Sequence, residues 1–222
     1  MGFRFGAIDA VIENRTQFLA KNNLSYIDYI PMQSDHGDII KIVDRNALTK
    51  EVSSQEEAAK ADVLITQDKN LALLLTTADC QPVSFYDPET KTIALAHISR
   101  HTLAQNLAKK TVNFLCEDLH AHPADLLIHI GPHIKKESYE FPLPLKEVSP
   151  HLEPFIEEKD GYAYIDTVEA CLWQLTCAGV SKENIDISDV DTATSKNHFS
   201  YYVATRDALP DGRLATVLAM SD

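Results

Sequence analysis

Three side chains of the types that bind transition metals lie at separate points along this chain. His36 stands in D-H-G-D, Cys80 in T-T-A-D-C-Q-P, and His97 in A-L-A-H-I, seventeen positions after the cysteine. Three ligands of mixed nitrogen and sulfur type, with a fourth position open to water or substrate, are typical of a catalytic zinc. If the three side chains converge, the sequence predicts an enzyme in which they are both metal ligands and catalytic residues.

The ligand types leave the identity of the metal open. Imidazole and thiolate suit zinc and copper, and a bound metal would keep Cys80 as a thiolate at neutral pH. The residue types do not establish convergence, because a lone cysteine is often a small buried side chain and the chain has nine histidines. Zinc is the expected ion, with copper as the alternative.

Composition and charge limit the class of protein. With 222 residues, of which 45% are hydrophobic, the chain can form one sizeable core, so we expect a single domain over residues 1–222. The formal net charge of -13 repels phosphate backbones and anionic lipid surfaces. Small molecules are therefore the expected partners, and neither nucleic acid nor a membrane is.

The four cysteines lack the dense spacing of a disulfide-stapled secreted protein, and no C-x-x-C pair occurs. The first ten residues have no basic segment followed by an apolar core, and no apolar stretch reaches the roughly 18 residues that span a bilayer. The sequence thus predicts a soluble, unprocessed protein of the cytoplasm with reduced thiols. It does not predict an oligomeric state.

Helical and strand periodicities alternate along the chain. They predict an α+β fold, with mixed β-sheets and flanking helices. Cys80 would follow one strand and His97 would end another, where loops on a rigid scaffold commonly carry chemistry. The proline-rich stretch at 142–154 is expected to be a surface connection with a short helix. The predicted helices lie at 8–20, 103–119 and 168–178, and the predicted strands at 25–30, 38–43, twice within 61–78, and at 83–86, 92–98, 126–132, 185–190 and 214–220.

Polar residues near the three candidate ligands are candidates for binding substrate. His101 follows His97 by four residues, but His97 is expected to end a strand, so we predict that His101 lines the pocket or caps a helix. Arg100 precedes it and is the nearest cation. His133 follows Gly131-Pro132 in a turn that could border the same pocket. Arg100, His101 and His133 are therefore the predicted substrate-binding residues.

Other polar residues have structural explanations that compete with functional ones. His120 and His122 are expected to end a helix, and His129 to be a hydrogen-bonded residue of a strand. Asp79 is suited equally to hold a ligand imidazole, to carry a proton or to form a turn. The two arginines of A-T-R-D-A-L-P-D-G-R, Arg206 and Arg213, are expected to be solvated rather than part of the site.

Several motifs occur in an order that resembles a known family. The most specific are T-A-D-C-Q-P-V at 77–83 and the seventeen-residue step to A-H at 96–97. The others are H-G at 36–37, I-G-P at 130–132 followed by Y-E at 139–140, and F-S-Y at 199–201. From about Glu13-Asn14-Arg15 onward, the chain is similar to the laccase-domain family, the multicopper polyphenol oxidase-like proteins now regarded as purine nucleoside phosphorylases.

The resemblance implies a zinc held by His36, Cys80 and His97. It implies phosphorolysis of adenosine, inosine, guanosine and methylthioadenosine, with deamination of adenosine as a companion activity. Zinc-activated water suits the deamination, whereas phosphorolysis requires cations that place phosphate against the ribose carbon.

The chain departs from the family pattern at several places. The family usually has A-G-W-R-G after the histidine, where this chain has I-S-R-H-T at 98–102, so Arg100 stands one position away from the family arginine. Likewise, Asp191-Thr192 stands for Cys-Thr, Y-Y-V at 201–203 stands for Y-R-R, and a glycine-containing N-terminal segment is absent. The resemblance therefore predicts the metal site more firmly than the phosphate site.

Two alternatives differ in class from a zinc phosphorylase. In a metal-free cysteine hydrolase or amidase, Cys80 would be the nucleophile and His97 its base. A non-catalytic metal-binding or interaction protein would keep the three ligands without turnover.

Overall fold

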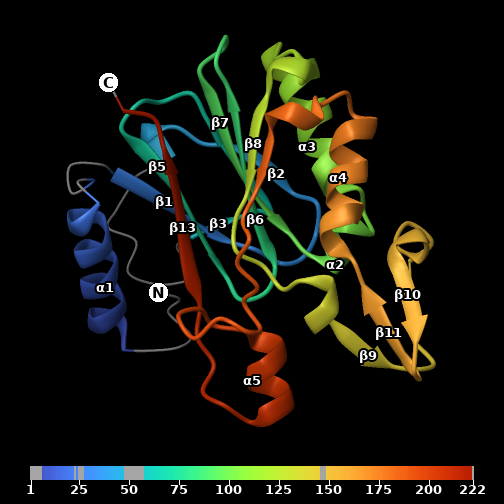
Figure 1. The fold of residues 1–222 in the computed structure, drawn as a ribbon. Coiled ribbons are helices and arrows are strands. Elements are labelled where there is room, and N and C mark those ends of the chain that lie inside the picture. Colours follow the sequence, from blue (N-terminus) through green and yellow to red (C-terminus); the bar gives the residue numbers. More distant parts are fainter. Residues whose placement is uncertain (1–6, 23, 25–27, 48–57, 146–148, 222) are drawn as a thin grey trace.

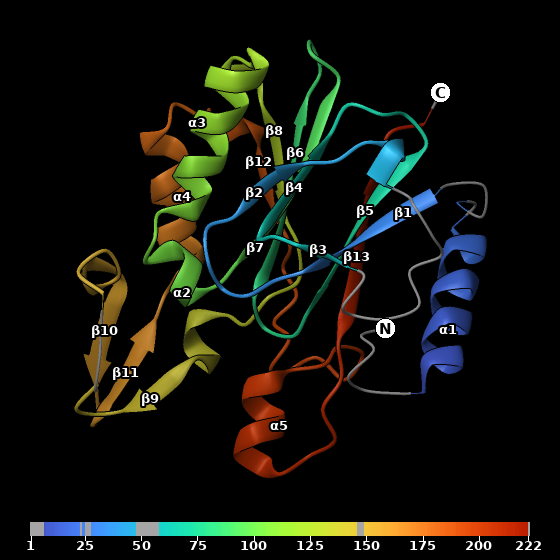
Figure 2. The same ribbon diagram turned by 180° about the vertical axis from the view of Figure 1, so that it is seen from behind.

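The computed structural model describes residues 7–22, 24, 28–47, 58–145 and 149–221. Two β-sheets lie face to face, with a helix pair outside one of them and a single helix outside the other (Figures 1 and 2). A third, small sheet and helix α5 (Tyr201–Asp207) lie together at one end of this stack. The fold is α+β with mixed sheets and flanking helices, as predicted.

The largest sheet has six strands in the order β12-β8-β6-β7-β4-β2. Strands β4, β7, β6 and β8 pair antiparallel, whereas the edge strands β2 and β12 pair parallel to their neighbours. The strands of this sheet are β2 (Ile40–Ile42), β4 (Val63–Thr66), β6 (Gln81–Asp87), β7 (Thr92–Ile98), β8 (Leu127–Ile130) and β12 (Ile185–Ile187).

The other sheets are smaller. The second sheet has the order β13-β5-β1-β3, and the third has the order β10-β11-β9. Their strands are β1 (Asp28–Gln33), β3 (Ala59–Lys60), β5 (Leu71–Thr77) and β13 (Leu214–Ala219), and β9 (Glu140–Pro142), β10 (Ile156–Lys159) and β11 (Tyr162–Ile165). The remaining α-helices are α1 (Ile8–Lys21), α2 (Arg100–Leu103), α3 (Leu107–Leu119) and α4 (Thr167–Cys177).

Most predicted elements are confirmed within one to three residues, because their apolar periodicity matches the faces that they bury. The predicted strand at 25–30 begins outside the described residues and continues as β1 to Gln33. The predicted helix at 103–119 is divided into α2 and α3, since Asn106 adopts a left-handed backbone with φ 59° between them. Within the described chain, the sequence pattern did not predict α5, the two-residue strand β3 or the small sheet, whose strands have three or four residues each.

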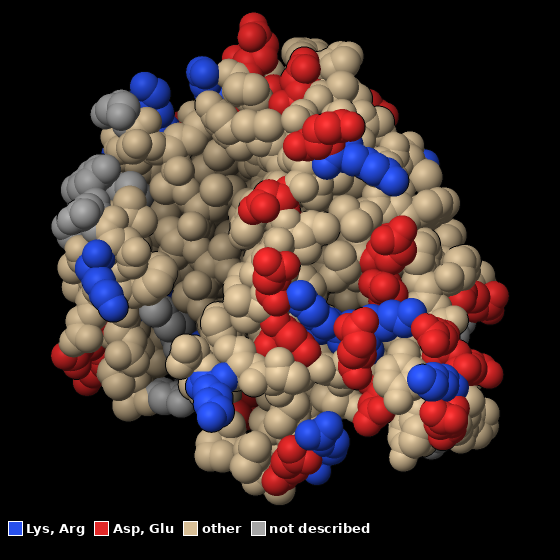
Figure 3. Space-filling model, viewed as in Figure 1, with Lys and Arg blue, Asp and Glu red and all other residues tan. Residues whose placement is uncertain are grey.

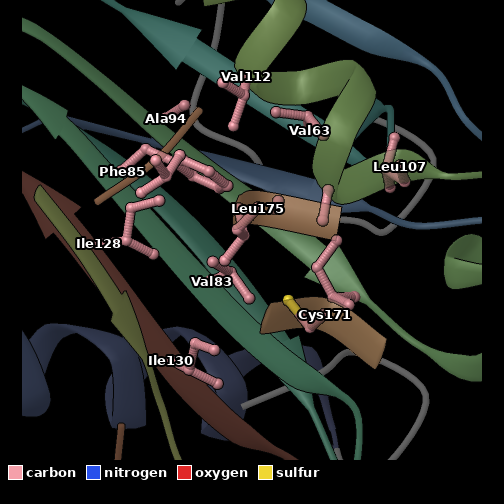
Figure 4. Close-up of a cluster of buried hydrophobic side chains, with 14 of the residues drawn as sticks. Val63, Val83, Phe85, Ala94, Leu107, Val112, Ile128, Ile130, Cys171 and Leu175 are labelled. Atoms are coloured by element: carbon pink, nitrogen blue, oxygen red, sulfur yellow. The ribbon is translucent and has the colours of Figure 1, made fainter. Parts of the chain in front are cut away.

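The alternation of side chains along β4 and β7 produces two cores on opposite faces of the six-stranded sheet. Val63 and Ile65 face α3 and α4, whereas Leu64 faces the second sheet. The first core joins Val83, Phe85 and Ile128 of the sheet to Leu107, Val112 and Leu175 of the helices (Figure 4). Because β4 and β7 are buried on both faces, they are held firmly beneath the loops at their ends.

Helix α1 packs outside the second sheet through Val11 and Leu19, and the Arg15 guanidinium carbon lies 5.8 Å from the centre of the Tyr29 ring. Asp9 lies in the first turn of α1, where an acidic side chain favours the helix dipole. In the described part of the chain, none of the helices is long and apolar enough to cross a membrane.

Gly131 lies where β8 leaves the sheet beside Pro82. Its N–H donates to the Pro82 carbonyl at 2.9 Å, and a Cβ at this position would lie 2.8 Å from Pro82 Cγ. We therefore expect Gly131→Ala to reduce the free energy of unfolding by about 1–3 kcal/mol, the usual effect of overpacking. Chemical denaturation measures this loss. The second change Pro82→Ala removes the clashing ring, so the double variant should recover part of the loss, and purely additive losses would contradict this explanation.

Candidate metal centre and substrate cavity

The three candidate ligands lie at one edge of the six-stranded sheet. Strands β6 and β7 are antiparallel, with Pro82 opposite His97, so the start of β6 lies beside the end of β7. Cys80 immediately precedes β6, and His97 is the penultimate residue of β7. The start of β2 pairs with the start of β4, which places the turn that carries His36 at the same edge.

The ligand atoms of His36, Cys80 and His97 all lie within 4.8 Å of one another. The two imidazole rings meet edge to face, with ring centres 4.8 Å apart. His97 is 4% exposed, whereas His36 is exposed and Cys80 is partly buried. The three side chains thus form a compact donor set of two nitrogens and one sulfur that is open on one side.

Asp62 was not predicted as a site residue, yet its carboxylate contacts the turn that carries His36 and the ring of His97. Its carboxylate accepts hydrogen bonds from the Ser34 hydroxyl at 2.6 Å and from the N–H groups of His36 and Gly37 at 3.1 and 2.9 Å. These bonds hold the turn at His36, whose backbone has a left-handed φ of 59°. Asp62 also directly precedes β4, so it ties this turn to the most buried part of the sheet.

Ser34 and Asp62 also orient the His97 ring. Its Nδ1 hydrogen-bonds with the Ser34 hydroxyl and lies 3.5 Å from Asp62 Oδ1. Since Nδ1 is occupied, Nε2 is the nitrogen available to a metal. A carboxylate or hydroxyl partner on the second imidazole nitrogen is the usual companion of a metal-binding histidine. The sequence signal for Asp62 was its place directly before the apolar run V-L-I-T.

Cys80 and His97 shift each other's pKa toward the charged forms. Burial raises the pKa of Cys80, but the positive charge of His97 and hydrogen bonds with His36 and His97 lower it to about 6. Burial likewise lowers the pKa of His97, but the Cys80 thiolate and Asp62 raise it to about 9. Without a metal, the pair is therefore a thiolate and an imidazolium, and the thiolate form is the one that binds metals.

A cavity of about 380 Å³ opens in front of these residues. His36, Cys80 and Asp79 line it, together with aromatic side chains of α5, of β9 and of the residue just before β9. Tyr139, Phe141 and Tyr202 form a cluster of edge-to-face rings, with centres 4.8 to 5.9 Å apart. We refer to Tyr139, Phe141 and Tyr202 as the aromatic wall.

Two of the three predicted substrate-binding residues lie on this cavity. Arg100 and His101 occupy the first turn of α2, which begins three residues after His97. The Arg100 guanidinium carbon lies 5.2 Å from the centre of the Phe141 ring, within cation–π range. The His101 ring lies 5.8 Å from that of His36, in agreement with the predicted pocket-lining position.

His133 does not lie on the cavity. It is 1% exposed, and its Nδ1 hydrogen-bonds with the Gly131 carbonyl at 2.8 Å. Its backbone pairs with the loop before α5, since the Thr192 N–H donates to the His133 carbonyl at 2.9 Å. The turn after β8 points this side chain into the protein, which the sequence pattern could not indicate.

Arg206 and Arg213, which were both expected to be solvated, occupy different positions relative to the cavity. Arg206 lies on α5 and lines the cavity, with its guanidinium 2.8 Å from Asp207. Arg213 is paired with Asp211 and lies outside the cavity. Arg206 is exposed to solvent, as expected, but residues 201–207 form a helix rather than a loop, and this helix places the side chain at the cavity.

His120, His122 and His129 occupy the structural positions that the sequence suggested. His120 ends α3 with a left-handed backbone, and His122 lies 3.5 Å from Asp125. His129 hydrogen-bonds with Asp186 of the neighbouring strand at 2.7 Å.

The charged side chains on one face of the molecule reflect the acidic composition (Figure 3). On the face drawn in Figure 3, the described Lys and Arg side chains lie among Asp and Glu side chains rather than in a continuous basic area. Arg100 lines the cavity, and within the described chain no carboxylate forms a salt bridge with it, in contrast to Arg206. Its charge is therefore directed to the cavity.

Comparison with known proteins agrees with this architecture. A solved structure, that of YlmD from Geobacillus stearothermophilus, is 25% identical and superposes with a TM-score of 0.89 over 100% of this chain and 84% of that one. The structure of the Bacillus licheniformis hypothetical protein YfiH has 26% identity and a TM-score of 0.84, covering 96% of this chain and 82% of that chain.

Relatives with assigned names are similar over most of the chain. The purine nucleoside phosphorylase ORF3 of Streptomyces griseus is 28% identical over 93% of this chain and 80% of its own length. The purine nucleoside phosphorylase YlmD of Bacillus subtilis is 25% identical over 96% of this chain and 78% of its own length. The family model described as multi-copper polyphenol oxidoreductase laccase matches residues 5–221. The chain therefore belongs to this laccase-like family.

Proposed function

We propose that the protein is a zinc-dependent purine nucleoside phosphorylase whose single catalytic domain spans residues 1–222. The observation that carries this proposal is the convergence of His36, Cys80 and His97 beside a cavity that His36, Cys80 and the aromatic wall line. The names of its relatives support the same activity. The four free cysteines support a reducing compartment such as the cytoplasm.

The donor set suits zinc. His36, Cys80 and His97 would hold the metal with two imidazoles and one thiolate, and three protein ligands are the number typical of catalytic zinc sites. Copper shares these ligand preferences and is the alternative ion. When bound, zinc would supply Lewis acidity at this position. Asp62 and Ser34 would keep Nε2 of His97 free and oriented for it.

The cavity walls suit a purine nucleoside and phosphate. Aromatic side chains offer faces for stacking a purine, and burial raises the pKa of Tyr139 to about 12, so its hydroxyl remains a donor at neutral pH. Arg100 offers a planar, permanently charged guanidinium of the kind that binds phosphate through paired hydrogen bonds. The His101 ring lies 5.8 Å from that of His36 and lines the same cavity, so it can bind the same substrates.

The reaction requires phosphate and nucleoside to be held together. A phosphate oxygen forms a bond to C1′ of the ribose while the bond from C1′ to N9 of the purine breaks. The electron pair of that bond leaves with the purine, which takes up a proton, and the products are the base and ribose 1-phosphate. Positioning contributes strongly to such a displacement, because it removes the entropic cost of bringing two substrates together.

Two further activities are proposed for the same cavity. Methylthioadenosine would undergo the same phosphorolysis. Adenosine deamination would replace the exocyclic amine at C6 by an oxygen from water and release ammonia. It would require the purine ring, rather than the ribose, to face the metal.

Metal analysis coupled to activity assays tests the main proposal. Purified protein should contain zinc at near one equivalent per chain and convert inosine and adenosine to free base only when phosphate is present. Base release that does not depend on phosphate would contradict phosphorolysis. Ammonia release from adenosine measures the deaminase activity separately.

Arg100 should govern the use of phosphate. We expect Arg100→Gln to raise the KM for phosphate about 10- to 100-fold, because a charge-assisted hydrogen bond contributes about 1.5–3 kcal/mol. Zinc content should remain unchanged. Arg206→Gln should have a smaller effect, since Asp207 already pairs with this guanidinium.

The matched control for these variants is Arg45→Gln. Arg45 lies outside the cavity, in an exposed pair with Asp28. Equal changes in phosphate KM for Arg45→Gln and Arg100→Gln would remove Arg100 from the site. Steady-state kinetics at saturating inosine measure all three variants.

A metal-free cysteine hydrolase is the second candidate, and the thiolate–imidazolium pair of Cys80 and His97 favours it specifically. Alkylation of Cys80 distinguishes the two candidates. Zinc should block alkylation if Cys80 is a ligand, whereas stoichiometric alkylation in the presence of zinc would favour the hydrolase. Full zinc loading without nucleoside turnover would instead indicate a non-catalytic metal-binding protein.

A further inference from the structure

Asp79 lies between the metal ligands and the aromatic wall. It directly precedes Cys80, is 8% exposed, and has a left-handed backbone φ of 82°, which is unusual for a residue with a side chain. Its own carbonyl accepts the Ile134 N–H at 3.0 Å, so its backbone is held from the side of the turn after β8. The surrounding structure therefore maintains this conformation and aims the carboxylate away from Cys80.

The carboxylate of Asp79 binds two groups that are distant in sequence. Oδ1 accepts a hydrogen bond from the Thr192 hydroxyl, and Oδ2 accepts one from the Tyr202 N–H, both at 2.7 Å. Thr192 and Tyr202 bracket the loop that leads into α5. Asp79 therefore holds both ends of this loop from a position adjacent to a candidate metal ligand.

Tyr202 carries the connection onward to the aromatic wall. Its hydroxyl donates to the Glu140 carbonyl of β9 at 2.6 Å, and its ring contacts those of Tyr139 and Phe141. The path from Cys80 through Asp79 and Tyr202 to β9 thus consists of one peptide link and two short hydrogen bonds.

We propose that Asp79 is a positioning residue that sets the placement of the aromatic wall relative to the metal ligands. A carboxylate forms stronger hydrogen bonds than a neutral acceptor, and here it accepts from the first turn of α5, whose N–H groups have no partner within the helix. Asp79 does not bond to a ligand imidazole, a role that Asp62 takes instead. The effect of Asp79 on nucleoside binding rests on the proposed function, whereas its effect on α5 does not.

Asp79→Asn separates positioning from metal binding. The amide keeps the shape of the side chain but carries no charge. It has one oxygen, so it can no longer accept hydrogen bonds from the Thr192 hydroxyl and the Tyr202 N–H through two charged oxygens. We expect zinc to remain near one equivalent while the dissociation constant for inosine, measured by calorimetry without phosphate, rises about 10-fold. An unchanged constant for inosine would overturn the proposal.

Asp87→Asn is the matched control. Asp87 is also a buried aspartate, 1% exposed, and its carboxylate accepts hydrogen bonds from Glu89 and Thr90. It lies at the opposite end of β6 from Cys80, roughly 20 Å away along the strand. Asp87→Asn should lower thermal stability without changing inosine binding. If both variants lose inosine binding equally, the effect is general destabilisation and the proposal fails.

Hydrogen exchange tests the connection without any nucleoside. Zinc should slow amide exchange over residues 201–207 of the wild-type protein, because ordering Cys80 also orders Asp79. In Asp79→Asn, zinc should bind without this protection, and Thr192→Val, which keeps the Tyr202 bond, should retain most of it. Equal protection by zinc in the wild type and Asp79→Asn, or none in either, would overturn the positioning role. If the wild type binds no inosine, the proposed function fails, and the exchange result still decides the role of Asp79.

Discussion

Cys80→Ala is expected to abolish zinc binding and to reduce nucleoside phosphorolysis at least about 100-fold, because a metal contributes several kcal/mol to catalysis at such sites. Cys80 is the sulfur donor among three ligand atoms that lie within 4.8 Å of one another. Its loss leaves two imidazoles, of which His36 is exposed. Metal analysis after dialysis, together with phosphate-dependent inosine assays, measures both effects.

Cys177→Ala is the control for this experiment. Cys177 is an exposed free cysteine at the end of α4, away from the cavity. It should retain full zinc and full activity. Retention of zinc by Cys80→Ala would show that the metal is held elsewhere. Loss of activity with zinc retained would point to the cysteine nucleophile.

Asp62→Ala is expected to weaken zinc binding about 10- to 100-fold, as removal of an outer-shell partner typically does. The change also leaves the Ser34 hydroxyl and the N–H groups of His36 and Gly37 without their acceptor. These groups are only partly buried, so we expect the free energy of unfolding to fall by about 1–3 kcal/mol in total, less than three fully buried groups would cost. Zinc titration and chemical denaturation measure the two effects.

Asp62→Asn separates these effects, since one side-chain oxygen remains to accept hydrogen bonds. It should be more stable than Asp62→Ala and still bind zinc more weakly than the wild type. Asp186→Ala is the control, because this exposed aspartate pairs with His129 rather than with a candidate metal ligand. Wild-type zinc affinity in both Asp62 variants would show that Asp62 supports only the turn at His36.

The sequence was sufficient for most of the fold, because long apolar runs have a clear period. The run V-L-I-T and the strand T-I-A-L-A-H-I are buried on both faces of the sheet, and their composition reflects this burial directly. Helix α5 was missed because its seven residues are held by Ser200 and by the distant Asp79 rather than by an apolar face of its own. The strands of the small sheet were too short to show a period.

The sequence by itself determined the chemistry available at the site, since residue types decide which ligand atoms exist and Cys80 and His97 lie in recognisable motifs. Only the tertiary structure decided which other side chains hydrogen-bond with these residues and orient them. Asp62 and Ser34 reach His97 because parallel and antiparallel pairing bring the starts of β2, β4 and β6 to the end of β7. His133 turned inward, and Arg206 turned toward the cavity, through backbone directions that spacing along the chain does not encode.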